Sequence, residues 1–165
     1  MWTAISTQGI IGPFFFHDTV TKERYKDMLE NSFIPHLLAT GLPIHTQWFM
    51  QDGACPHAAN VFLDFLYETF NPCVMSHWFP ERHEGGKLWP PQSPDINPCD
   101  FFLWVFLKEK VFQRRPENVA QLRVHIVKLC HAHSEDLCRK VVTNARVHLQ
   151  EVVRQNGGHI EHVLH

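Results

Sequence analysis

A proline-rich stretch directly ahead of a strongly apolar run constrains the fold more than any other feature of this sequence. The segment Trp89–Pro98, WPPQSPDINP, contains four prolines, and each fixes φ and lacks a backbone N–H donor. It therefore cannot form the interior of a strand or a helix. The run Phe101–Leu107, FFLWVFL, follows almost at once and predicts a buried helix that begins at Asp100. The sequence thus predicts a stiff loop that holds the Asp100 carboxylate at the entrance to a buried helix.

Length and composition predict one ordinary globular domain. The chain has 165 residues, of which 44% are hydrophobic, enough to bury a substantial core. It contains no apolar run of about 18 residues and no basic, apolar leader at its start, so we expect an intracellular protein with no membrane partner. The five cysteines are odd in number and form no C-x-x-C pair, which predicts reduced thiols.

Charge is spread unevenly along the chain. Residues 1–107 hold 5 basic and 11 acidic side chains, whereas residues 108–165 hold 10 basic and 6 acidic ones. A polyanion would therefore contact the second half first. Four basic residues follow the buried helix and could contact DNA phosphates, although an ordinary solvated helix face is the equal alternative. They are Lys108, Lys110, Arg114 and Arg115.

The pattern of apolar residues predicts a mixed α/β fold with a helical C-terminal part over residues 115–165. A hairpin is expected over residues 2–7 and 10–16, then a helix over 19–38 and a strand that ends at Asp52. A second helix is expected over residues 58–70, followed by a loop and a short element at 87–89. Further helices are expected from Asp100, over residues 117–133, and from Ser134 to the glycines at 157 and 158.

Two carboxylates occupy positions from which they could bind a metal ion. Asp52 ends a predicted strand, where open α/β sheets place functional groups, and Asp100 begins a helix. Together they would suit Mg²⁺, which prefers oxygen ligands. The ordinary alternatives are a turn residue for Asp52, which precedes a glycine, and a helix cap worth about 1 kcal/mol for Asp100. Spacing and composition alone do not decide between these interpretations.

Two motifs resemble the catalytic domain of mariner/Tc-type transposases, which carry three acids on an RNase H-like fold. The first is Gln51-Asp52-Gly53-Ala54 with His57, which is similar to the family's Q/H-D-x-A-x-x-H motif. The second is Ser93-Pro94-Asp95 with Pro98, Asp100 and Trp104, which is similar to S-P-D-x-x-P-x-D/E-x-x-x-W/F. Both occur in the family's order, and the resemblance covers nearly the whole chain.

The resemblance implies an RNase H-like fold, a mixed sheet flanked by helices, and a function in DNA transposition. It makes Asp52 and Asp100 the second and third acids and ligands for Mg²⁺ or Mn²⁺, with His57, Asp95 and Asn97 in support. Asp95 would brace the turn, and His57 would be a structural or phosphate-facing group. The implied partner is DNA, with no small-molecule substrate, and the implied location is the nucleus. A homodimer is expected on a separate ground, because a sheet edge left bare by a missing first strand favours association with a second copy.

The sequence also departs from the family's pattern. The family's first acid lies on a strand that precedes the segment matched by residues 2–6, and its DNA-reading helix-turn-helix domains lie further upstream. We therefore expect a truncated catalytic domain that lacks the first strand and is inactive alone. The alternative is a non-catalytic, transposon-derived protein that binds nucleic acid or a protein partner through its basic helical end.

Overall fold

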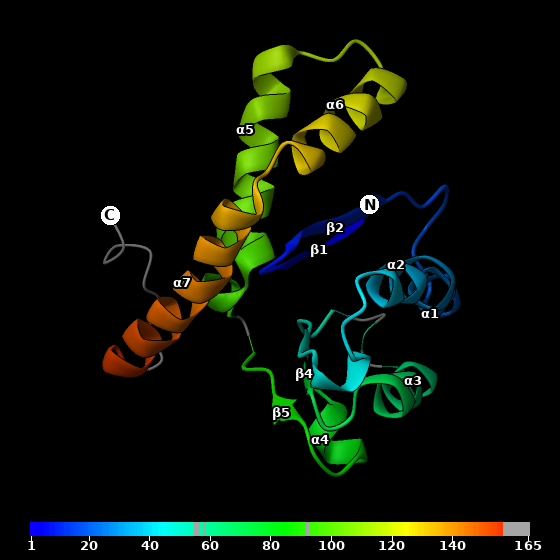
Figure 1. Ribbon diagram of the computed structural model, residues 1–165, viewed down its shortest axis with the longest axis vertical. Coiled ribbons are helices and arrows are strands. Elements are labelled where there is room, and N and C mark those ends of the chain that lie inside the picture. The colour runs from blue at the N-terminus through cyan, green and yellow to red at the C-terminus, as the bar shows by residue number, and fades with distance from the viewer. Residues whose placement is uncertain (55–56, 58, 92, 157–165) are drawn as a thin grey trace. The chain divides into compact units, whose positions relative to one another are not determined.

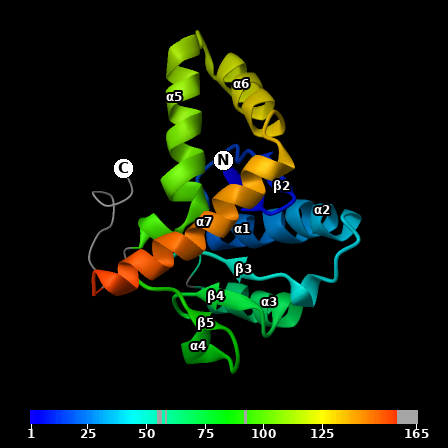
Figure 2. The same cartoon turned by 60° about the vertical axis from the view of Figure 1, so that its left-hand side comes forward.

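The computed structural model describes residues 1–54, 57, 59–91 and 93–156. The chain divides into two compact units, each described here by itself. The hairpin unit consists of Met1–Phe15 and Pro94–His165, and the sheet unit consists of Phe16–Ser93. Figure 1 and Figure 2 together label the α-helices and strands of both. None of the helices within the described ranges is both long enough and apolar enough to cross a membrane.

A small parallel sheet organises the sheet unit. Its strands are β3 (Phe49–Met50), β4 (Val74–Ser76) and β5 (Lys87–Leu88), in the order β3-β4-β5. Phe49 pairs with Val74, and Met75 pairs with Lys87. On the central strand β4, Val74 is 0% and Ser76 is 1% exposed, whereas Met75 between them is half-buried. Because residues two apart on a strand share a face, one face of β4 is fully covered and the other is covered in part.

Helices supply most of the apolar surface of the sheet unit. The predicted helix over residues 19–38 is present as α1 (Lys22–Met28), a π-helical segment (Leu29–Phe33) and α2 (Ile34–Ala39). The Thr21 hydroxyl accepts a hydrogen bond from the Arg24 N–H and caps α1, as a threonine does at this position. The second predicted helix is α3 (Asn60–Phe70). Their buried rings pack in two groups: Tyr25 contacts Phe62, and Phe33 and Phe70 contact each other and Phe49 of β3.

The hairpin unit combines residues from the N-terminal and the C-terminal parts of the chain. Strands β1 (Trp2–Ser6) and β2 (Gly9–Phe14) pair antiparallel, as the sequence predicts, with a register irregularity between Trp2 and Ala4. The proline-rich loop enters this unit through a 3₁₀ turn (Pro94–Ile96) and a π-helical segment (Cys99–Trp104), which continues into α5 (Val105–Arg114).

The C-terminal part of the hairpin unit is helical, as predicted, with α6 (Val119–His131) and α7 (Glu135–Arg154). Figure 1 and Figure 2 both show α5 and α6 side by side, and Leu103, Leu107 and Cys130 form a buried cluster between them. Burial raises the pKa of the Cys130 thiol to about 11, so it packs as a neutral apolar group. The predicted helix stop at residues 157 and 158 lies outside the described residues.

The prediction of an uninterrupted loop between α3 and the short element at residues 87–89 is wrong. That stretch contains β4 and a one-turn helix, α4 (Phe79–Arg82). Three residues are too few to show a period, and the nearby Pro72 and Pro80 signal turns. Where the sequence predicts one mixed sheet, the described strands pair as a hairpin in one unit and a parallel sheet in the other.

Candidate functional site

Asp52 lies immediately beyond the last backbone contact of strand β3. The Gln51 N–H donates to the Met75 carbonyl oxygen at 3.0 Å and extends the pairing of β3 with β4 by one residue. Asp52 therefore stands at the carboxyl end of a parallel strand, as the sequence predicts. Because the sheet fixes the preceding peptide, the direction in which Asp52 leaves the strand is well defined.

His57 and a backbone amide hold the Asp52 carboxylate. The His57 Nδ1 lies 2.8 Å from Asp52 Oδ1, and the Ala54 N–H donates to the same oxygen at 3.1 Å. The hydrogen bond from His57 is the main cause of a lowered Asp52 pKa; the Ala54 N–H and the His57 charge also lower it, and partial burial opposes them. The side chain keeps 48% of its surface exposed. Asp52 is thus an ionised, oriented carboxylate that remains open to solvent.

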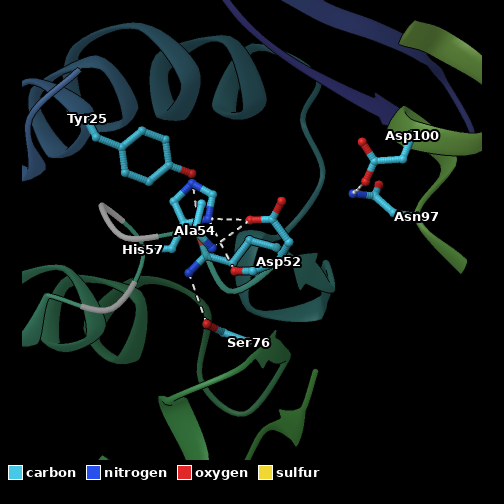
Figure 3. A network of polar contacts seen from close by, with 8 residues as sticks. Tyr25, Asp52, Ala54, His57, Ser76, Asn97 and Asp100 are labelled. Atoms are coloured by element: carbon cyan, nitrogen blue, oxygen red, sulfur yellow. Dashed lines mark hydrogen bonds and ion pairs between the residues drawn. The ribbon is translucent and has the colours of Figure 1, made fainter. Parts of the chain in front are cut away.

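A buried polar network lies behind Asp52 and is drawn in Figure 3. The Gln51 amide accepts a hydrogen bond from the Tyr25 hydroxyl at 3.3 Å and donates one to the Ser76 hydroxyl at 3.0 Å. The Tyr25 ring also packs on the His57 ring, with 4.7 Å between centroids. Tyr25 therefore contacts the residue before Asp52 and the histidine that holds it.

Sequence reasoning did not identify Tyr25 or Ser76 as site residues. Tyr25 lies within the helix predicted over residues 19–38, and Ser76 lies within the predicted loop. The one available signal was Gln51, whose long amide at a buried strand end requires two polar partners.

Asp100 is the second residue of the π-helical segment, as expected of a carboxylate at a helix start. Asn97 Nδ2 donates to Asp100 Oδ2 at 2.7 Å, and Asn97 Oδ1 accepts from the Cys99 N–H at 3.1 Å. The Asp100 N–H donates to the Asn97 carbonyl oxygen at 2.9 Å. Asn97 therefore orients both the backbone and the carboxylate, and the helix N-terminus also favours a negative charge there.

The other predicted residues occupy the hairpin unit. Asp95 lies in the 3₁₀ turn that precedes Asn97. The basic residues lie on α5 and at its end: Lys108, Arg114 and Arg115 are exposed, and Lys110 is half-buried beside Glu109 at 3.7 Å. Arg115 ends the helix with a φ of 44°, in the left-handed conformation. The structure thus groups Asp52 with His57 in one unit, and Asp95, Asn97 and Asp100 in the other.

The donor chemistry of the two carboxylates suits a hard divalent cation. Carboxylate oxygens are ligands that Mg²⁺ and Mn²⁺ prefer, and a hydrogen bond orients the carboxylate in each residue. Within the part of the chain that the structure describes, no three His, Cys, Asp or Glu side chains lie together as a metal-binding group. Each carboxylate, taken by itself, is thus a possible single ligand, and water or further ligands would have to complete the coordination of an ion.

The fold is that of a mariner transposase catalytic domain, an RNase H-like mixed α/β fold with a long C-terminal helix. A solved structure of the Mos1 transposase catalytic domain with raltegravir and Mg matches the chain with a TM-score of 0.74. That match has 17% sequence identity and covers 96% of this chain and 75% of that chain. The crystal structure of the Mos1 mariner catalytic domain alone gives a TM-score of 0.72 at 17% identity, covering 96% and 74% of the two chains.

Larger Mos1 assemblies contain the same fold. The Mos1 mariner paired-end complex with Mn matches with a TM-score of 0.74 at 18% identity, covering 96% of this chain and 44% of that chain. The chain therefore spans less than half of the transposase present in that complex. No protein-family model and no curated protein sequence matches the chain. At this level of identity the comparisons establish the fold alone.

Proposed function

We propose that this chain supplies two carboxylates of a metal-dependent DNA-cleaving and strand-transfer site, as part of a transposase catalytic domain. The observation that carries the proposal is the placement of the two motif carboxylates on this fold. Asp52 follows a parallel strand, and Asp100 begins the helix after the proline-rich loop. The similarity to Mos1 structures that contain Mg or Mn supports the choice of cation.

Each carboxylate has a defined part in the proposed reaction. Asp52, ionised and half exposed, would be one metal ligand, while His57 fixes its orientation. Asp100 would be another, with its carboxylate oriented by Asn97. When bound, such an ion stabilises the charge that develops on the attacking and leaving oxygens of a phosphodiester.

We further propose that full activity needs a third carboxylate, the family's first acid, on a strand that precedes the matched segment in the family. Two-metal chemistry stabilises both reacting oxygens, and two carboxylates hold a second ion poorly. The proposed partners are DNA and a second copy of the chain, and the proposed location is the nucleus. The 165-residue chain should accordingly give no strand transfer and only trace nicking with Mn²⁺.

A second candidate function is binding of nucleic acid without catalysis. The hairpin unit carries 10 basic and 8 acidic side chains, whereas the sheet unit carries 5 basic and 9 acidic ones. The exposed Lys108, Arg114 and Arg115 lie on the more basic unit. Contacts of this kind bind phosphates without reading sequence, so the affinity would fall steeply with salt.

A plasmid-nicking assay in Mn²⁺ separates the two candidates. The 165-residue chain is compared with a chain extended by the family's first strand and its Asp. We expect the extended chain to cleave, and Asp52→Ala or Asp100→Ala to abolish cleavage, while Asp95→Ala retains it with lowered stability. Cleavage that survives Asp100→Ala would refute the assignment of the acid. Salt-sensitive DNA binding without cleavage by either chain would favour the second candidate.

A further inference from the structure

A buried histidine on α7 contacts the chain on both sides of Asp100. His148 is 6% exposed. Its Nδ1 lies 2.6 Å from the Asp95 carbonyl oxygen, and its ring lies 4.2 Å from the Phe101 ring between centroids. Asp95 precedes Asp100 by five residues, and Phe101 follows it directly. One side chain of the C-terminal helix therefore contacts both ends of the short segment that carries the carboxylate.

Both ring nitrogens of His148 have a polar partner. A carbonyl oxygen can only accept, so Nδ1 donates to Asp95 and the ring is the Nδ1–H tautomer. Nε2 then accepts from the Asn144 side-chain amide, whose nitrogen lies 3.0 Å away. A buried group with both partners satisfied has one strongly preferred orientation, because any other leaves a nitrogen unpaired.

Hydrogen bonds continue from this contact to the carboxylate. The Asn97 N–H donates to the Pro94 carbonyl oxygen at 3.0 Å, which closes the turn around Asp95. The Asn97 amide then reaches Asp100 Oδ2 at 2.7 Å. A displacement of the Asp95 peptide would therefore move Asn97, and with it the carboxylate of Asp100.

We propose that His148 is a positioning residue for Asp100. It sets the place of the carboxylate through the Asp95 peptide and the Phe101 ring and touches neither metal nor DNA. The C-terminal helix α7 is then part of the framework of the site, although the sequence motifs end well before it. This inference rests on the proposed function, in which Asp100 binds the ion.

Two substitutions separate the hydrogen bond of His148 from its packing. His148→Asn places an amide nitrogen near the position of Nδ1 and keeps a donor for Asp95. His148→Phe keeps a ring against Phe101 and removes the donor. His133→Phe is the matched control, because the His133 ring also packs against the segment that carries Asp100, at Phe102, but its hydrogen bond goes to the Leu129 carbonyl oxygen at 2.7 Å and not to the Asp95 turn.

The first measurement is amide hydrogen exchange without metal, at the N–H groups of Cys99 and Asp100 that bind Asn97. We expect His148→Phe to accelerate this exchange by roughly tenfold, the order expected for one lost hydrogen bond, and His148→Asn to stay near the parent chain. The second measurement is Mn²⁺ affinity, which should fall about 10- to 100-fold in His148→Phe, as for other residues that orient ligands. His133→Phe should leave both unchanged.

Unchanged exchange in His148→Phe, or equal effects of the Asn and Phe variants, would overturn the inference. So would unchanged Mn²⁺ affinity in His148→Phe when Asp100→Asn abolishes binding. If Asp100→Asn leaves the Mn²⁺ affinity unchanged, the proposed function is refuted instead. The hydrogen-exchange measurement alone would then test whether His148 positions the segment around Asp100. If His148→Phe fails to fold, Asn144→Ala removes the partner of Nε2 from an exposed position. It should then accelerate the same exchange to a smaller extent, and no acceleration would overturn the inference.

Discussion

The two units of this chain are stabilised by different means. Among the described residues, the least exposed aromatic side chains, at 2% or less, are Tyr25, Phe62, Phe70 and Phe79, and all of them belong to the sheet unit. The hairpin unit buries smaller groups such as Leu103 and Cys130, and a hydrogen bond of His148 to Asp95 joins distant segments of it. Because aromatic burial contributes more per residue, we expect the sheet unit to have the stronger core.

The two candidate metal ligands, Asp52 and Asp100, also differ in the contacts that hold them. Asp52 is held by the imidazole of His57, whose ring packs against the buried ring of Tyr25. Asp100 is held by the amide of Asn97, in a segment that His148 of α7 contacts through a hydrogen bond to Asp95. Asp52 therefore depends on a side chain that packs against the aromatic core, and Asp100 depends on the C-terminal helix.

The largest expected effect tests the aromatic core of the sheet unit. Phe62 is 0% exposed and packs against Tyr25 and Phe65. We expect Phe62→Ala to lower the free energy of unfolding by about 3–5 kcal/mol, because it removes a large side chain and leaves a cavity. Urea denaturation followed by circular dichroism measures this loss.

Phe112→Ala is the matched control, since Phe112 lies on α5 of the hairpin unit and is 75% exposed. It should change the free energy of unfolding by no more than about 0.5 kcal/mol. Losses of equal size for the two substitutions would contradict the contrast drawn between a buried aromatic cluster and an open helix face.

A smaller effect tests the polar network behind Asp52. Gln51→Leu leaves the buried hydroxyls of Tyr25 and Ser76 without the partner they now share. The expected cost is about 1–3 kcal/mol in the free energy of unfolding. Gln113→Leu, at an exposed position on α5, should cost less than about 0.5 kcal/mol in the same urea titration. A Gln51→Leu variant as stable as this control would show that the network does not constrain the strand end.

The smallest effect concerns the pH dependence of Asp52. The pKa of this carboxyl is lowered from its ordinary value of 3.8, chiefly by the hydrogen bond from His57. A lowered folded-state pKa stabilises the fold above the unfolded-state value, and this contribution is lost as the pH falls through the folded-state pKa. His57→Ala should therefore raise the Asp52 pKa toward 3.8 and reduce the loss of stability below about pH 4.

Carbon-13 NMR of the Asp52 carboxyl measures this pKa directly. His45→Ala, at an exposed position of the same unit, is the control and should leave the Asp52 pKa unchanged. An Asp52 pKa that does not respond to His57→Ala would mean that the backbone N–H of Ala54 is the dominant partner.

The sequence predicted those parts of the fold that short-range physics determines. The four prolines of Trp89–Pro98 required a loop, and the long apolar periods gave α3, α5, α6 and α7. Strand β4 was missed because three residues carry no periodic signal, and its pairing with β3 and β5 depends on contacts distant in sequence. A short strand that forms only because neighbouring strands pair with it cannot be predicted from its own residues.

For the candidate site, too, the sequence predicted only the residues that lie within short motifs. Asp52, His57, Asn97 and Asp100 stand within two short motifs, so the sequence alone could identify them. Tyr25, Ser76 and His148 act through contacts across 25 residues or more, and no local pattern distinguishes them from other core residues. Residues that support a site from elsewhere in the chain need the tertiary structure for their assignment.

The central proposal is that Asp52 and Asp100 are ligands of the same ion. A direct test is paramagnetic broadening of backbone amide NMR signals during Mn²⁺ titration of the 165-residue chain. If one ion binds both carboxylates, the signals around Asp52 and Asp100 broaden together at the same Mn²⁺ concentration, and Asp52→Asn or Asp100→Asn abolishes both effects. Two carboxylates that share an ion lie on the order of 4 to 7 Å apart, well within the range of such broadening. Broadening around one carboxylate only, or broadening that persists in both variants, would contradict the account.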